Sequence, residues 1–209
     1  MNNFVFSIPT TAYFGKGQIS VLGETIRQHG GSKVLLAYGG GSIKANGVYD
    51  ATIEQLNNAG LAYVELSGIQ PNPRIESVEE GIRLYHENGC DFILGVGGGS
   101  TLDACKGIAA GVKYDGSVSD LFRDETGLSP ISAAAPLATI LTMAGTGSEL
   151  DMGAVITVGA DHKKICGRGR TWHSCGNRQG RGATDYARGF LIQRFTGAEK
   201  CYLITRTGA

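Results

Sequence analysis

Residues 91–103, with the sequence DFILGVGGGSTLD, decide the fold that we expect for this chain. The first six residues form a largely apolar run with little alternation, which is typical of a strand buried on both faces. Three glycines and a serine interrupt the run, and Leu102, Cys105 and Ile108 then follow at helical spacing. This order of strand, glycine turn and helix predicts one unit of a parallel sheet covered by helices.

The same pattern recurs at residues 33–42, KVLLAYGGGS, and the flanking sequence extends it. Apolar runs predict further strands at residues 11–14, 62–66, 137–141 and 154–158, the first of them paired with residues 5–6. Periodicity predicts helices at residues 18–29, 47–58, 75–88 and from residue 101 onward. The alternation predicts an α/β fold, a Rossmann-like parallel sheet with flanking helices and right-handed crossovers.

Both glycine turns fall where ligands bind in such folds, at the carboxyl ends of the strands. Because glycine has no Cβ, backbone N–H groups in these turns can approach a phosphate closely, and the next helix N-terminus adds partial positive charge. A tight turn without any ligand is the simpler alternative for a single copy. Two copies, each after a buried strand, favour a nucleotide site, although neither has the usual G-x-G-x-x-G spacing.

Two further polar features accompany the turns. Asp103 falls in the first turn of the helix that follows the second glycine turn, where a carboxylate can cap the helix or face a bound ligand. Residues 142–149, TMAGTGSE, follow a predicted strand and offer several hydroxyl groups and backbone N–H groups. Taken alone, this second segment is an ordinary polar loop.

Five motifs occur in a specific order: residues 14–17 (FGKG), 38–44 (YGGGSIK), 71–73 (PNP), 95–103 (GVGGGSTLD) and 145–149 (GTGSE). As an ordered set they resemble the iron-containing (group III) alcohol dehydrogenases, and within them the NAD(P)H-dependent butanol dehydrogenase branch. The resemblance implies an NAD(P)-binding α/β domain over residues 1–164, similar to the N-terminal domain of dehydroquinate synthase. It also implies an oxidoreductase that transfers hydride between NAD(P)H and a small alcohol or aldehyde.

The resemblance implies roles for individual residues. Gly39, Gly40, Gly41 and Ser42 would hold the adenosine ribose side of the cofactor, and Gly97, Gly98, Gly99 and Ser100 would hold its pyrophosphate. Asp103, the candidate catalytic residue, would lie near the nicotinamide and the substrate, in a pocket lined by Thr142, Thr146, Gly147 and Ser148. The first turn lacks the acidic residue that repels a 2′-phosphate in NAD-selective members, so NADP(H) is favoured over NAD(H).

In that family a C-terminal helical domain supplies an aspartate and three histidines to Fe²⁺ or Zn²⁺, and homodimers are the expected assembly. The resemblance ends after residue 165, and no aspartate–x3–histidine pair follows: Asp185 has Gly189 four residues later, and no histidine follows His173. We therefore expect this chain to lack the metal ligands and the helical domain. Weak or absent catalysis, and poor solubility through uncovered apolar surface, are the corresponding expectations.

Residues 165–209 differ in composition from the rest of the chain. Residues 1–160 carry 9 basic and 16 acidic side chains, whereas residues 161–209 carry 10 basic and 3 acidic ones. Leu, Ile, Val and Phe make up 6 of the last 44 residues, a fraction typical of poorly ordered segments, although residues 183–193 suit a helix and residues 201–205 a strand. We interpret this segment as a non-native continuation of the family sequence.

Two other interpretations of the segment remain. One is a Zn²⁺ site built from His162, Cys166, His173 and Cys175, whose spacing matches no familiar zinc pattern. The other is a basic arm that binds nucleic acid. The scattering of the arginines along the sequence argues against this interpretation.

The composition limits the class of protein. No apolar stretch approaches the roughly 18 residues that a membrane span needs, and no secretory signal begins the chain, so a cytoplasmic location without a membrane partner is expected. The five cysteines are irregularly spaced, and Cys90 and Cys105 are expected to be buried free thiols. Two alternatives to an oxidoreductase remain: a non-catalytic nucleotide-binding fragment, and a nucleic-acid binder that uses the basic tail.

Overall fold

The computed structural model describes residues 10–15, 17–122, 131, 133–143, 145, 147–151, 153–159, 163–168, 189–194 and 201–205. The main-sheet strands are β1 (Thr11–Gly15), β2 (Lys33–Tyr38), β3 (Ala62–Leu66), β4 (Phe92–Gly97), β5 (Leu137–Leu141), β8 (Gly189–Arg194) and β9 (Cys201–Thr205). A separate hairpin consists of β6 (Gly153–Val158) and β7 (Lys163–Arg168). The helices are α1 (Leu22–Gln28), α2 (Ser42–Ala45), α3 (Val48–Asn58), α4 (Ile75–Glu87) and α5 (Gly99–Gly111), with 3-10 turns at Gln18–Val21 and Val118–Phe122.

The main sheet has the strand order β1-β9-β8-β5-β4-β2-β3. The pairs β3–β2, β2–β4, β4–β5 and β5–β8 are parallel, whereas β9 runs antiparallel to β8 and to β1. The predicted parallel α/β sheet with flanking helices is therefore confirmed for its centre. Strands β2, β3 and β5 have the bounds expected from the sequence.

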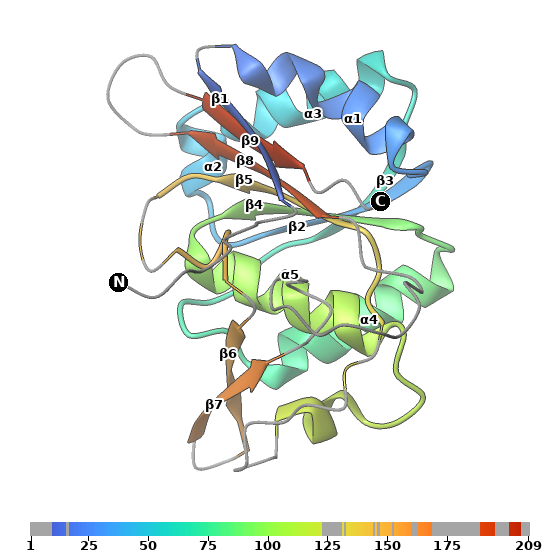
Figure 1. Cartoon of the computed structure of the whole chain (residues 1–209), viewed down its shortest axis with the longest axis vertical. Coiled ribbons are helices and arrows are strands. Elements are labelled where there is room, and N and C mark those ends of the chain that lie inside the picture. The colour runs from blue at the N-terminus through green and yellow to red at the C-terminus, as the bar shows by residue number, and fades with distance from the viewer. Residues whose placement is uncertain are drawn as a thin grey trace, which may run out of the picture.

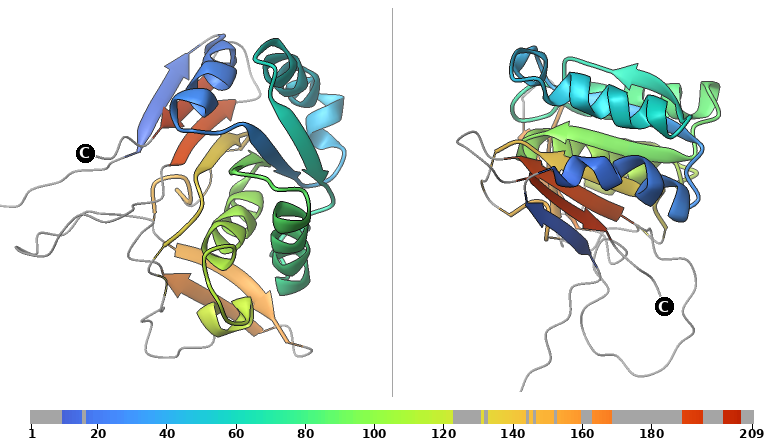
Figure 2. Two further views of the ribbon diagram at one scale, coloured as in Figure 1. Left: turned by 90° about the vertical axis from the view of Figure 1, so that its right-hand side faces the viewer. Right: turned by 90° about the horizontal axis from the view of Figure 1, so that it is seen from above.

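Helices cover both faces of the sheet (Figure 1). Helices α1 and α3 lie on one face, and α4 and α5 lie on the other, with the β6–β7 hairpin beyond α5 (Figures 1 and 2). Alternate residues of β2 serve the two layers: Leu36 belongs to the core beneath α1 and α3, and Leu35 to the core beneath α4 and α5. Burial on both faces explains why this strand reads as a continuous apolar run.

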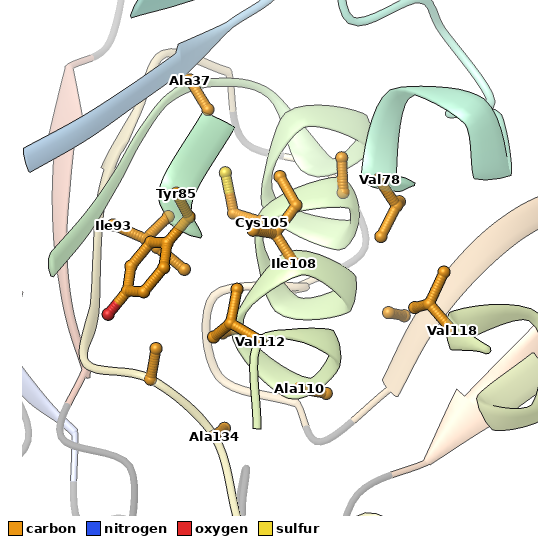
Figure 3. Close-up of a cluster of buried hydrophobic side chains, with 14 of the residues drawn as sticks. Ala37, Val78, Tyr85, Ile93, Cys105, Ile108, Ala110, Val112, Val118 and Ala134 are labelled. Carbon is orange, nitrogen blue, oxygen red and sulfur yellow. The ribbon is translucent and has the colours of Figure 1, made fainter. Parts of the chain in front are cut away.

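Helix α5 packs closely against the sheet and against α4. Figure 3 shows Cys105 and Ile108 of α5, and Val112 directly after it, among the buried side chains of the core. A Cβ at Gly95 of β4 would lie 2.8 Å from the Cys105 sulfur, and a Cβ at Gly81 of α4 would collide with Ile108. Because these two glycines have no side chain, β4 and α4 can approach α5 closely, and this packing fixes the position of α5.

The two cysteines singled out from the sequence, Cys90 and Cys105, are buried free thiols, as expected. Complete burial raises the pKa of the Cys105 thiol to about 12, so this sulfur acts as a small apolar core group.

The structure corrects three expectations. The helix expected at residues 18–29 is a 3-10 turn followed by a shorter α1. The strand expected at residues 154–158 forms as β6, but it pairs antiparallel with β7 outside the main sheet, because only residues 159–162 separate it from β7, a length that favours a hairpin. Residues 189–193, expected to end a helix over residues 183–193, lie in β8.

Strand β8 supplies a partner for the edge of β5, and its apolar sequence suits a sheet interior. The strand expected at residues 201–205 is β9. The pairing expected for residues 5–6, and much of the segment after residue 168, lie outside the described residues. The division into residues 1–164 and 165–209 stays a prediction.

Candidate functional site

The carboxyl ends of β2, β4 and β5 lie side by side at one edge of the sheet. Tyr38 is in register with Val96, and Gly97 is in register with Leu141. The two glycine turns and the segment after β5 therefore start next to one another. From β2 the chain passes to β3 on one side, and it later returns to β4 on the other side, so the two turns flank the point where the strand order reverses, which is where α/β folds bind ligands.

The second glycine turn joins β4 to α5 with little room. Gly97 still belongs to β4, and a Cβ there would collide with the side chain of Thr101, which is buried. Gly98 is the N-cap of α5 in an extended conformation, and no side chain caps the helix. The backbone N–H groups of Gly99 and Ser100, in the first turn of a 13-residue helix, have no intrahelical acceptor and suit an anionic ligand.

The first glycine turn is more open. Gly41 caps α2, which has four residues, and a Cβ at Gly40 or Gly41 would meet no atom within 4 Å. At Gly39 a Cβ would lie 3.1 Å from the carbonyl oxygen of Ile69. Ser42 is exposed. Backbone at this turn is accessible, and the protein leaves free space beside it.

The loop at residues 71–73 connects the second turn to the hairpin. Asn72 donates its backbone N–H to the Ser100 hydroxyl over 3.2 Å, and its φ of 55° is in the left-handed region, which asparagine tolerates better than most residues. Thr157 of β6 donates its N–H to the carbonyl of Pro73 over 2.8 Å. The Ser100 hydroxyl thus organises this loop, a contact that the sequence did not indicate, and its role at the pyrophosphate stays a prediction.

Asp103 lies just beyond the first turn of α5, because the helix begins at Gly99 and not at residue 101 as expected, and its carboxylate faces β6. Its Oδ2 accepts the backbone N–H of Val155 over 3.1 Å, while its Oδ1 is buried and has no hydrogen-bond partner among the described residues. Burial raises the pKa of Asp103, and the Val155 N–H, Lys106 and the Ser148 hydroxyl act in the opposite direction. A carboxylate oxygen at this edge therefore retains acceptor capacity for a ligand.

The segment after β5 contributes the third wall. Thr142 donates its N–H to the carbonyl of Gly97 over 2.9 Å, and Gly147 begins a turn that buries Ser148. Thr146, the remaining predicted residue of this wall, lies outside the described residues. Sequence reasoning missed Met143, which is 67% exposed and lies against Gly98. An apolar residue within a polar, glycine-rich segment was the signal available in the sequence.

A cluster of charged and aromatic side chains beside the first turn was also missed. The Lys44 ammonium lies 4.6 Å from the ring centroid of Tyr49 and 5.4 Å from that of Tyr38. Both tyrosines donate their hydroxyls to Glu65 of β3. Because Glu65 lies 16 residues from Tyr49 and 27 from Tyr38, no local pattern indicated that these side chains meet.

The glycine turns fit a dinucleotide. The extended N-cap at Gly98, the free N–H groups of α5 and the open backbone at Gly40 and Gly41 supply the narrow, side-chain-free approach that a pyrophosphate needs. The described residues do not fit a metal ion, because no three or more His, Cys, Asp or Glu side chains lie together among them.

A parallel sheet whose glycine turns flank the reversal of strand order is the architecture of dinucleotide-binding α/β domains. The sequence model of one such group, described as iron-containing alcohol dehydrogenase, matches residues 9–171. The chain belongs to the iron-containing alcohol dehydrogenase family. This confirms the resemblance drawn from the ordered motifs, and the match extends to residue 171, beyond residue 165, where the resemblance was expected to end.

Individual relatives agree with this assignment. The NADH-dependent butanol dehydrogenase A of Clostridium acetobutylicum is 48% identical over 165 residues, which are 79% of this chain and 41% of that protein. The NADPH-dependent aldehyde reductase YqhD of Escherichia coli is 40% identical over 83% of this chain and 43% of its own. The crystal structure of the Thermotoga maritima NADH-dependent butanol dehydrogenase A superposes with a TM-score of 0.77 at 41% identity, over 83% of this chain and 43% of that one.

The chain spans about two fifths of the length of these curated relatives. The relatives include enzymes named for NADH and for NADPH. Among the described residues, none of the helices has the length and apolar character needed to cross a membrane.

Proposed function

We propose that this chain is the cofactor-binding portion of an NAD(P)-dependent oxidoreductase that interconverts small alcohols and aldehydes. The observation that carries the proposal is the pair of glycine turns side by side at the carboxyl ends of β2 and β4, one of them opening onto the unpaired N–H groups of α5. The family membership supports the reaction type.

Each part of the site has a role in this proposal. Gly39, Gly40, Gly41 and Ser42 hold the adenosine ribose side, and Gly97, Gly98, Gly99 and Ser100 place the pyrophosphate at the N-terminus of α5. Thr142, Thr146, Gly147 and Ser148 line the nicotinamide pocket, where Asp103 offers its unpaired Oδ1 as an acceptor. The bound nicotinamide supplies or accepts the hydride, while the protein excludes water and orients the reacting carbon.

We further propose that NADPH is accepted in preference to NADH. The first turn carries no acidic residue, and Lys44 is the cation nearest to it along the chain. Glu65 is the nearby carboxylate, but it is engaged by the hydroxyls of Tyr38 and Tyr49. A 2′-phosphate beside Gly41 would therefore meet a cation and open space. A homodimer and a cytoplasmic location complete the proposal by extension from the family.

The deciding experiment is a fluorescence titration of the purified chain with NADPH and NADH, compared with the variant Gly98→Asp. Position 98 has N-cap geometry, and a Cβ there meets only Met143, at 3.5 Å. Aspartate is a slightly better N-cap than glycine, so the variant should unfold at an equal or higher denaturant concentration, with a gain of roughly a few tenths of a kcal/mol. The added carboxylate should nevertheless abolish nucleotide binding, because it occupies the anion position.

Gly98→Ser is the matched control, since it supplies a neutral cap of similar size. We expect it to retain measurable nucleotide binding. If Gly98→Asp binds NADPH as tightly as the wild-type chain does, the pyrophosphate is not held at α5 and the proposal is wrong. Oxidation of a short-chain alcohol by the chain, assayed with and without added Fe²⁺ or Zn²⁺, separates an enzyme from a nucleotide-binding module.

A further inference from the structure

Lys106 is a buried cation one helical turn after Asp103. Lys106 is only 6% exposed, although lysine is among the residues least often buried. Its ammonium donates to Asp151 Oδ1 over 2.6 Å, to the carbonyl of Asp151 over 3.2 Å and to the carbonyl of Gly153 over 2.7 Å. A lysine with acceptors for all three ammonium protons is held firmly in one place.

The acceptors all belong to the segment that leads from the predicted nicotinamide pocket into β6. Asp151 Oδ1 also accepts the N–H of Gly153 over 3.0 Å, and the N–H of Asp151 returns to the carbonyl of Gly147 over 3.1 Å. The turn that contains Ser148 is therefore closed on one side by Gly147 and anchored on the other by Lys106.

Helix α5 holds this segment at two consecutive points. Asp103 accepts the N–H of Val155, and Lys106, three residues later on the same helix face, binds Asp151 and Gly153. Because α5 also begins at the second glycine turn, one rigid helix fixes the anion position and the 147–155 segment relative to each other. The Lys106 charge also lowers the pKa of the Asp103 carboxyl, whereas the negative charge of Asp151 raises it.

We propose that Lys106 is a positioning residue of the cofactor site. It acts through Asp151 and Gly153, which it binds, to hold the turn of Ser148 beside the nicotinamide pocket. The inference rests on the proposed function, because it assigns the anchored segment to the cofactor pocket.

The test compares NADPH binding and amide hydrogen exchange in the wild-type chain, Lys106→Met and Lys106→Arg. Lys106→Met keeps the length of the side chain without its charge, and we expect NADPH binding to weaken about tenfold. Exchange at the Val155 amide should accelerate while exchange at Leu94, in the centre of the sheet, stays unchanged. Lys106→Arg, which retains the charge, should restore part of the affinity. Lys113→Met, an exposed lysine just after α5, is the matched control and should behave as wild type.

Asp151→Asn is the second variant, for the case in which Lys106→Met does not fold. Asp151 is half-exposed, and the substitution removes the ion pair while leaving the two carbonyl acceptors of Lys106. We expect it to fold and to bind NADPH about threefold more weakly. Wild-type affinity and unchanged Val155 exchange in Lys106→Met, or in Asp151→Asn, would overturn the positioning role. A wild-type chain that binds neither nucleotide would instead overturn the proposed function.

Discussion

The two glycine turns have the same four residues, yet the structure uses them differently. In the turn after β4, Gly97 is packed against Thr101, and a long helix begins at once. In the turn after β2, Gly40 and Gly41 face open space, and a four-residue helix follows. The first difference is therefore steric: packing demands a glycine at position 97, and a Cβ at the corresponding Gly39 would meet only the Ile69 carbonyl oxygen, at 3.1 Å. Among the described residues, no atom demands a glycine at position 40 or 41.

The charges beside the turns also differ. Lys44 lies two residues after Ser42, whereas Asp103 lies three residues after Ser100. Packing does not require Gly40 or Gly41, and Lys44 is close to them in sequence. Close approach of a negatively charged ligand would explain glycines at such positions. The comparison thus separates glycines kept by the fold from glycines that the proposed function explains, and each can be tested by substitution.

The largest effect is expected for Gly97→Ala. The added Cβ would overlap the Thr101 side chain, so Thr101 or the start of α5 must shift, and overpacking of this kind costs about 1–3 kcal/mol. We expect the free energy of unfolding, measured by urea titration without cofactor, to fall by that amount. Gly41→Ala is the matched control, since its φ of −73° suits alanine and its Cβ meets nothing. Its stability should change by less than about 0.5 kcal/mol. Equal losses in the two variants would show that the turns do not differ sterically.

Much of this fold could be predicted from the sequence because its signals are local. Strand β2 reads as a continuous apolar run since it is buried on both faces, and the second glycine turn follows directly from β4. The hairpin of β6 and β7 was harder to anticipate. Its first strand has the composition of any other strand, and only its partner distinguishes it from a member of the main sheet.

The candidate site was predictable to the same extent. The glycine turns and Asp103 are adjacent in sequence to the strands and helix that place them. Tyr49 and Glu65, in contrast, meet across 16 residues, and Lys106 and Asp151 across 45, so those contacts depend on the packing of whole elements. A lysine on a helix with small apolar neighbours gives no local indication of its partner.

The next effect concerns the cofactor at the first turn. In Gly41→Asp, a carboxylate would stand where the proposed 2′-phosphate binds, while the backbone tolerates the change because Gly41 caps α2 with ordinary dihedral angles. We expect NADPH affinity to fall by about tenfold relative to NADH affinity, since two like charges at short range repel strongly. Titrations at low and high salt provide the check, because screening should reduce the loss. An unchanged ratio of the two affinities would remove the 2′-phosphate from this turn.

A smaller effect is expected for Lys44→Met. The ammonium lies against two tyrosine rings, and methionine can keep that contact without the charge. We expect NADPH binding to weaken about threefold and NADH binding to stay unchanged, as for one partly exposed ion pair. Isothermal titration with both nucleotides measures the difference. Equal weakening of both would assign Lys44 to packing instead of phosphate recognition.

The smallest effect separates the charge of Asp103 from its hydrogen bond. Burial raises the pKa of this carboxyl in the folded chain, so between its ordinary value of about 4 and the raised value the folded state holds a proton that the unfolded state has lost. The contribution of Asp103 to stability is therefore fully present at acidic pH and is lost as pH rises through that window. Asp103→Asn removes the titration and can still accept the Val155 N–H. The free energy of unfolding of the variant, relative to that of the wild type, should therefore increase as the pH rises from acidic to neutral. Glu79→Gln, on the exposed face of α4, should produce no such trend. A constant difference between Asp103→Asn and wild type from pH 4 to pH 8 would show that burial does not disfavour the charged form of Asp103, and the unpaired Oδ1 would then be solvated instead of held for a ligand.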